Sequence, residues 1–199
     1  MKKIINRMCA LIRLTSKYIV SRNRFEYFAR NSYYQKPLRI IGGKYIKIYE
    51  NVSIKKYISL EAKKIYAENP EIVFGKGSVI GDFNHISAVK RIIIGEYVCT
   101  ANGIYISDYM PSNYDKKSAV RNQAPNLISD VYIGDGTWIG ENVAIMCAKI
   151  GKNCVIGANS VVTSDIPDYS VVVGNPGKII SNLKLKNMTR KREISKTYY

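Results

Sequence analysis

The chain has 199 residues, of which 46% are hydrophobic, enough to bury the core of one domain with short appendages. Its single His and its four Cys, none of them in a Cys-x-x-Cys pair, exclude a His-rich metal site, so we expect no metal. The net charge of +16 predicts an anionic partner such as phospholipid or a phosphorylated substrate, with solubility as the alternative.

The N-terminal residues 2–30 are predicted to form a basic amphipathic helix within a segment that ends at residue 36. Apolar residues recur there at helical spacing, namely Ile4, Ile5, Met8, Leu11, Ile12, Tyr18 and Ile19. Such a helix either caps the open end of the core that follows or lies on an anionic membrane. Charged residues interrupt the apolar stretch, so no signal peptide or membrane span is predicted. We expect a cytoplasmic protein, with peripheral contact at the inner membrane face through residues 1–36 as the alternative.

The dominant pattern of the chain is an aliphatic or aromatic residue at every sixth position. A six-residue period fits neither an amphipathic helix nor an alternating strand, and it is typical of a parallel β-helix. Each hexad supplies a short strand and a corner, three hexads close a coil, and stacked coils bury a continuous core. We therefore predict an all-β solenoid over residues 37–180. The series are Ile40, Ile46, Val52 and Ile58; Phe74, Ile80, Ile86, Ile92, Val98 and Ile104; Ile133, Ile139 and Ile145; and Ile150, Ile156 and Val162.

The period is interrupted over two stretches. Residues 61–71 lose it, and residues 107–130 replace it with a polar stretch that carries two prolines. A long insertion in a solenoid leaves the coil at one edge, and such loops are usually functional. The register of Ile92, Ile93 and Ile94 is ambiguous, because each of them could point inward. The run is predicted to end at Ile166, and residues 181–199 form a basic tail.

Three motifs near the C-terminus resemble the hexapeptide-repeat acyltransferases, and most closely the branch that O-acetylates sugars and bacterial surface glycans. They are Val-Tyr-Ile-Gly-Asp-Gly-Thr-Trp-Ile-Gly-Glu-Asn at 131–142, Ile-Gly-Ala-Asn-Ser-Val-Val-Thr at 156–163, and Val-Val-Val-Gly-Asn-Pro-Gly-Lys at 171–178. The resemblance covers about residues 72–180. It implies a left-handed parallel β-helix, a homotrimer, and acetyl-CoA bound between neighbouring prisms.

The resemblance also assigns roles in binding the acetyl donor. Ala158 and Thr163 would line the pantetheine channel, and Lys178 would lie near the phosphates of the cofactor, where a cation is useful. Glu141 occupies a coil position where relatives often have a small polar residue. Trp138 would flank the acceptor and the thioester. Corner packing is the alternative for Ala158 and Thr163, and a contact between protomers is the alternative for Trp138.

The chain departs from the family at the catalytic base. Many relatives read Asp-His-x-His after the central coils, whereas this chain reads Asp108-Tyr109-Met110-Pro111, so both histidines are replaced. Acetyl transfer to a hydroxyl needs a base within hydrogen-bond reach of that hydroxyl, and His suits this task near neutral pH. His85, the only His of the chain, is therefore the predicted general base.

Other polar residues are predicted to assist His85. Asp108 lies about one coil further on and would orient either His85 or the acceptor. Asn84 and Asn102 are candidates for polar contacts to the acceptor. Tyr109 is placed among the substrate contacts and is a poor substitute for the base, because its phenol is mostly protonated at neutral pH.

The leading prediction is acetyl-CoA-dependent O-acetylation of a sugar hydroxyl in a bacterial surface glycan or its precursor, by direct transfer. Two alternatives stay open: N-acetylation of an amino sugar, and a catalytically degenerate trimer that serves as a binding or scaffold module. A carbonic anhydrase on the same prism is excluded, because one His per protomer cannot supply the three ligands of each site. Nucleic acid is not an expected partner, since the 16 Tyr are scattered through the repeats. The sequence does not identify the sugar.

Overall fold

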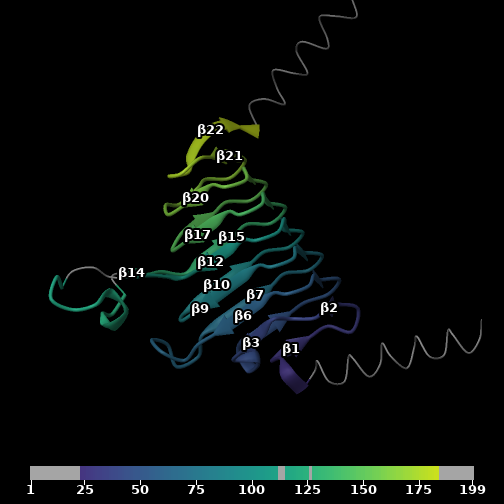
Figure 1. The fold of residues 1–199 in the computed structure, drawn as a ribbon. Coiled ribbons are helices and arrows are strands. Elements are labelled where there is room, and N and C mark those ends of the chain that lie inside the picture. The colour runs from purple at the N-terminus through teal and green to yellow at the C-terminus, as the bar shows by residue number, and fades with distance from the viewer. Residues whose placement is uncertain (1–22, 112–114, 126, 184–199) are drawn as a thin grey trace, which may run out of the picture.

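The computed structural model describes residues 23–111, 115–125 and 127–183. Their strands are short and pass in turn to three parallel sheets, so that successive coils stack along one axis (Figure 1). This arrangement of mostly parallel strands with few helices is consistent with the predicted β-helix of hexapeptide repeats. A loop that carries β14 protrudes from one side of the stack (Figure 1).

Each sheet collects one strand from successive coils. The first sheet contains β1 (Tyr27–Phe28), β4 (Ile46–Ile48), β7 (Glu71–Phe74), β10 (Arg91–Ile94), β15 (Val131–Ile133) and β18 (Lys149–Ile150). The second contains β2 (Tyr33–Tyr34), β5 (Ser53–Ile54), β8 (Val79–Ile80), β11 (Cys99–Thr100), β16 (Trp138–Ile139), β19 (Val155–Ile156), β21 (Ser170–Val173) and β22 (Lys178–Asn182). The third contains β3 (Arg39–Ile41), β6 (Ser59–Ala62), β9 (His85–Ala88), β12 (Tyr105–Ser107), β17 (Ala144–Met146) and β20 (Val161–Val162).

The remaining elements lie at the corners. The strands β13 (Tyr109–Met110) and β14 (Leu127–Ile128) form an antiparallel pair at the base of the protruding loop. The described residues also form two short 3₁₀ helices, η1 (Gly43–Tyr45) and η2 (Val120–Asn122). Since the coil passes from the first sheet to the second and then to the third, we name its corners first–second, second–third and third–first.

The hexad residues form the core, as the period predicts. From Ile46 to Val162 every member of the four series is at most 1% exposed, and Ile40 is partly buried against the same cluster. The ambiguous register is also resolved, because Ile92 and Ile94 are fully buried while Ile93 points to the outer face. Aliphatic side chains from neighbouring coils therefore form one continuous column.

The glycine that follows many hexad residues is required by close approach of the next coil rather than by the turn itself. A Cβ on Gly134 would lie 2.5 Å from the backbone carbon of Gly151, and its φ is not in the left-handed region. The left-handed residue comes two positions later, at Gly136, where φ is 68°. Asn and aromatic residues adopt the same conformation at other corners.

Replacing Gly134 with Ala is therefore expected to destabilise the fold by about 1–3 kcal/mol, because the added methyl group overlaps backbone atoms that cannot rotate away. Gly157→Ala is the matched control, since the nearest atom there belongs to the Val173 side chain. Urea unfolding of both variants measures the difference. Equal stabilities of the two variants would contradict this account of the repeat.

The run of buried hexad positions is longer at both ends than the sequence indicates. Ile166 pairs with Ile150, but the coil continues into β21, where Val172 is fully buried six residues after Ile166. The predicted end at Ile166 is therefore wrong. Residues 178–182 then fold back as β22, antiparallel to β21.

The last part of the predicted N-terminal helix is also wrong. Tyr27–Phe28 and Tyr33–Tyr34 form strands that pair with β4 and β5, because Phe25, Phe28 and Tyr34 pack against one another and on the core. The coils thus begin before residue 37. Residues 1–22 and 184–199 lie outside the described residues, and the predictions for them stay predictions. Within the described ranges, no helix has the length and hydrophobicity needed to cross a membrane.

Candidate active site

His85 lies on the outer face of the third sheet, at the start of β9. In the register of the sheet it stands between Ser59 of β6 and Tyr105 of β12. Its imidazole contacts the Tyr105 ring edge-on, with the ring centroids 5.4 Å apart. The His85 side chain is 44% exposed, whereas its Nε2 atom is buried and has no hydrogen-bond partner among the described residues. One end of the imidazole therefore faces the protein while the ring remains accessible.

Glu61 is the carboxylate that faces this buried end. Its Oε2 lies 3.7 Å from His85 Nε2, and its side chain is only 6% exposed. It also pairs with Lys63 and, at 3.4 Å, with Arg39. Burial raises the pKa of Glu61, but the hydrogen bond from Lys63 and the charges of Lys63, His85 and Arg39 outweigh burial and lower it. Glu61 thus stays ionised beside His85.

Two buried hydroxyl groups extend this polar cluster across the sheet. Ser87 and Ser107 stand in register with Glu61, two residues along the strand from His85. Lys63 Nζ lies 3.5 Å from Ser87 Oγ. Ser107 donates to the carbonyl oxygen of Tyr109 at 2.9 Å and accepts from its N–H at 3.2 Å. The cluster therefore joins His85 to the base of the protruding loop.

Asp108 has a different environment from the one that the sequence suggests. It is fully buried, and its carboxylate accepts hydrogen bonds of 2.7–3.1 Å from the backbone N–H groups of Val89, Lys90 and Arg91. Burial raises the pKa of Asp108, and these backbone donors act in the opposite direction. The carboxylate thus holds the turn between β9 and β10, and Glu61 is the acid that faces His85.

Asn84 likewise uses its polar atoms inside the protein. It is buried, its amide donates to Thr100 Oγ1 at 2.8 Å, and its oxygen accepts from the Ile104 N–H at 2.8 Å. It therefore fastens one coil to the next at the second–third corner. This geometry favours a supporting position behind His85 over direct contact with an acceptor.

A second group of predicted residues lines that same corner on the outside. Asn102 accepts from the Asp82 N–H at 2.9 Å and donates to Glu141 Oε1 at 3.2 Å, and the Asn159 N–H donates to the Glu141 carbonyl oxygen. Ala158 is exposed, next to Asn159. The structure thus brings Asn102, Glu141 and Ala158 into one column along the corner from which the third sheet starts.

The other predicted residues lie elsewhere. Trp138 is 44% exposed on the second sheet, in register with Cys99 and Val155. Thr163 is exposed at the third–first corner, and Lys178 is exposed at the start of β22. Tyr109 begins the protruding loop, where it is half-buried. One protomer therefore does not bring Thr163 to the Glu141 corner, whereas Lys178 pairs with Val173 at the end of the second sheet, where that corner begins.

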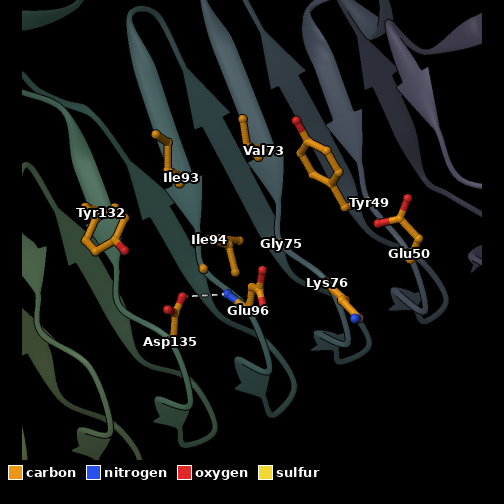
Figure 2. Close-up of a pocket in the computed structure, with 11 residues that line it drawn as sticks. Tyr49, Glu50, Val73, Gly75, Lys76, Ile93, Ile94, Glu96, Tyr132 and Asp135 are labelled. Carbon is orange, nitrogen blue, oxygen red and sulfur yellow. Dashed lines mark hydrogen bonds between the residues drawn. The ribbon is translucent and has the colours of Figure 1, made fainter.

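Two hollows mark the surface of the described residues. The first has a volume of about 290 Å³ and lies on the first sheet, with Tyr49 and Tyr132 flanking Val73 and Ile93 (Figure 2). Because His85 is on the third sheet, this hollow faces away from the candidate base. The second, of about 270 Å³, lies between the protruding loop and the third–first corner and includes Tyr109. No group of three His, Cys, Asp or Glu within the described ranges is placed to hold a metal.

Glu61 is the functional candidate that sequence reasoning missed. It lies 24 residues before His85, more than the three hexads of a regular coil, because the corner at residues 63–70 is extended. It also falls where the hexad pattern fades. The sequence did offer one signal for Glu61. It lies in Ser59-Leu60-Glu61-Ala62, a strand that ends with a buried alanine, and so does the strand His85-Ile86-Ser87-Ala88.

Comparison with known proteins agrees with the fold. The model of the bacterial transferase hexapeptide (six repeats) matches residues 130–164. A probable acetyltransferase of Mycobacterium tuberculosis is 37% identical over 122 residues, which are 61% of this chain and 40% of that protein. A putative lipopolysaccharide biosynthesis O-acetyl transferase of Escherichia coli is 32% identical over 118 residues, 55% of this chain and 59% of that protein. The chain thus spans about half the length of these curated relatives.

Solved structures give the same result. The crystal structure of a maltose O-acetyltransferase from Clostridium difficile is 28% identical, with a TM-score of 0.51 over 83% of this chain and 74% of that one. Other structures with this fold hold acetyl coenzyme A or coenzyme A. The buried hexad column, the matched repeats and these relatives together make the chain similar to the hexapeptide-repeat transferases.

Proposed function

We propose that the protein transfers an acetyl group from acetyl-CoA to a hydroxyl of a sugar in a bacterial surface glycan or its precursor, and that it works as a homotrimer. The relatives named above support this proposal, since two of them are named as O-acetyltransferases, of maltose and in lipopolysaccharide biosynthesis. The observation that carries it is an accessible imidazole, His85, with a buried ionised carboxylate at one end.

The geometry suits His85 to the task of general base. With its Nε2 facing Glu61, the proton of the neutral imidazole is favoured on Nε2, and Nδ1 is the atom that accepts. The sugar hydroxyl attacks the thioester carbonyl carbon while its proton passes to Nδ1. The carbon–sulfur bond then breaks, and the thiolate of CoA takes that proton from the imidazolium. The acetyl group has moved from sulfur to oxygen, and His85 is neutral again.

Direct transfer is favoured over an acetylated cysteine. Burial raises the pKa of the Cys147 thiol and of the Cys154 thiol, which leaves little thiolate to attack a thioester. Cys99 is exposed, but it lies on the second sheet beside Trp138 rather than beside His85. The imidazole therefore acts on the acceptor hydroxyl.

Acetyl-CoA would bind along the second–third corner. Glu141 and Ala158 lie in the corner column, and Trp138 lies on the adjoining second sheet. Since Thr163 lies away from that corner, its proposed contact with the donor requires a neighbouring protomer. Membrane contact through residues 1–36 and the cytoplasmic location stay predictions.

The second candidate is a degenerate trimer that binds without catalysis, and Tyr109 and Pro111 in place of the family histidines favour it. The deciding experiment is release of free CoA from acetyl-CoA with a panel of mono- and oligosaccharides, amino sugars included. We expect sugar-dependent release, with the acetyl group recovered as an ester. Binding of acetyl-CoA without release of CoA on any acceptor would establish the non-catalytic trimer. Recovery of the acetyl group as an amide would establish N-acetylation.

A change at Glu61 tests how His85 is held. Glu61→Gln keeps the shape of the side chain but removes the negative charge that faces His85 Nε2, so we expect kcat/KM to fall about tenfold, because a charge at this distance contributes roughly 1–4 kcal/mol. Glu68→Gln is the matched control, because Glu68 pairs only with the surface residue Lys64 among the described residues. Wild-type kcat/KM in a folded Glu61→Gln protein would remove Glu61 from the mechanism.

A further inference from the structure

We propose that the hollow between the protruding loop and the third–first corner binds the acceptor, and that Arg121 makes it select sugars with an anionic group, either a phosphate or a carboxylate. This inference rests on the proposed function and specifies its substrate class. The hollow is lined by Ile65, Tyr66, Val89, Tyr109, Pro111, Val120, Arg121, Gln123 and Pro125.

The loop segment that presents Arg121 is built by its own hydrogen bonds. The Gln123 side chain donates to the carbonyl oxygens of Asp115 and Ser118 at 2.8 and 2.9 Å, and it accepts from the Asp115 N–H at 3.1 Å. The segment is also fastened at its base by β13 and β14 and by the bond from the Ser129 N–H to the Asp108 carbonyl oxygen. Arg121, in η2, is thus held in place beside the corner.

The walls of the hollow suit a sugar ring. Tyr66 and Tyr109 offer aromatic faces, and two prolines and aliphatic side chains supply the remaining apolar surface. The volume of about 270 Å³ lies just below the range of roughly 300–1,000 Å³ that holds drug-sized ligands. One sugar ring with a charged substituent therefore fits better than a whole nucleotide sugar.

The charge of Arg121 indicates which class of sugar the hollow would bind. Arg121 is the one ionised side chain among the residues that line the hollow, apart from the weakly acidic tyrosines, and it forms no ion pair with any described residue. Nearby Lys90 is paired with Asp130 at 3.0 Å, and Lys64 is paired with Glu68. Arg121 Nε donates to Asn122 Oδ1 at 3.4 Å. A guanidinium without an ion-pair partner binds phosphate and carboxylate through two parallel hydrogen bonds.

The hollow is connected to the candidate base through two tyrosines. Tyr109 lines the hollow, and its backbone N–H and carbonyl oxygen bond to the Ser107 hydroxyl. Tyr105 contacts the His85 ring. Burial raises the pKa of Tyr105, and the neighbouring Tyr109 adds to this shift, so the Tyr105 phenol remains a neutral hydrogen-bonding group. The two tyrosines therefore lie between the hollow and His85.

The test compares three probes in the CoA-release assay and in equilibrium titration: glucose 1-phosphate, glucuronate and the neutral methyl glucoside. We expect both anionic probes to bind about tenfold more tightly than the neutral probe. Arg121→Gln should remove this preference by raising KM for the anionic probes about tenfold with little change in kcat, and Arg121→Lys should restore part of it. Lys116→Gln, on the same loop but outside the hollow, is the matched control.

The outcomes separate this inference from the proposed function. Equal KM values for charged and neutral sugars, unchanged in Arg121→Gln, would overturn the inference while acetyl transfer stands. If Arg121→Gln instead changes the oligomeric mass and not the binding of the probes, a second copy of the chain occupies the hollow, and the inference fails. If the anionic probes bind more weakly to Arg121→Gln than to the wild type, and no CoA is released by either protein, the result would support the subsite and overturn the proposed transfer. A preference for only one anionic probe would show whether Arg121 binds a phosphate or a carboxylate.

Discussion

His85→Ala is expected to lower kcat/KM for acetyl transfer by about 10²–10⁴-fold, the range that a positioned general base usually contributes. The reason is that the acceptor hydroxyl then attacks without a partner for its proton, since the described cluster offers in its place only Tyr105, with its raised pKa, and charged Lys63. Binding of acetyl-CoA should be nearly unchanged, because His85 is proposed to act on the acceptor hydroxyl and not to hold the donor. The measurement is the CoA-release rate with a saturating donor and a varied sugar.

Loss of activity must be separated from loss of structure. The His85 side chain is 44% exposed, so its truncation removes little packing, and the melting temperature should change by only a few degrees. Ser59→Ala is the matched control, because Ser59 flanks His85 in the same ladder of the third sheet. If the His85→Ala protein does not fold, the same activity measurement on His85→Asn tests the assignment. Wild-type kcat/KM in a folded His85→Ala protein would show that His85 is not the general base.

Asp108→Ala is expected to destabilise the fold by about 3 kcal/mol or more. Three backbone N–H groups at the turn between β9 and β10 would lose their acceptor, and a buried donor without a partner costs roughly 1–3 kcal/mol. Chemical unfolding, followed by circular dichroism, measures the loss. Asp130→Ala is the control, because Asp130 is partly exposed and pairs with Lys90 at the surface, an interaction of about 0–1 kcal/mol.

The same variant separates the two roles considered for Asp108. A carboxylate that only orients His85 would lower kcat when removed and leave the unfolding free energy nearly unchanged. A carboxylate that holds the turn lowers stability first, and activity falls because Val89 and Tyr109, which flank the hollow, lose their support. A fully stable Asp108→Ala protein with little activity would therefore contradict the structural role.

The hexad series was sufficient to predict the solenoid, because burial in each coil depends on one residue and its position in a local repeat. Phe74, Ile80, Ile86 and the later members are buried as the period requires. The pattern was less informative at the ends. Aromatic residues replace the aliphatic ones in β1 and β2, and Pro167 follows Ile166 and suggests a stop, although Val172 continues the period.

For the site, the sequence selected His85 because it is the only His of the chain, and it placed the loop at residues 107–130 because the period breaks there. It did not find Glu61 or the use of Asp108 by backbone donors. Both depend on which residues of neighbouring coils stand side by side. That register is set by the length of each corner, and corners such as residues 63–70 differ from the regular repeat.

The amino-acid sequence thus determined the coil, its apolar column, the position of the insertion and the resemblance to a transferase family, since all of these are written in local spacing. The tertiary structure decided that Glu61 faces His85, that Asp108 fastens a turn, and that Arg121 stands beside a hollow. These are contacts between different coils, and a periodic sequence does not specify them, because every coil presents the same pattern to its neighbours.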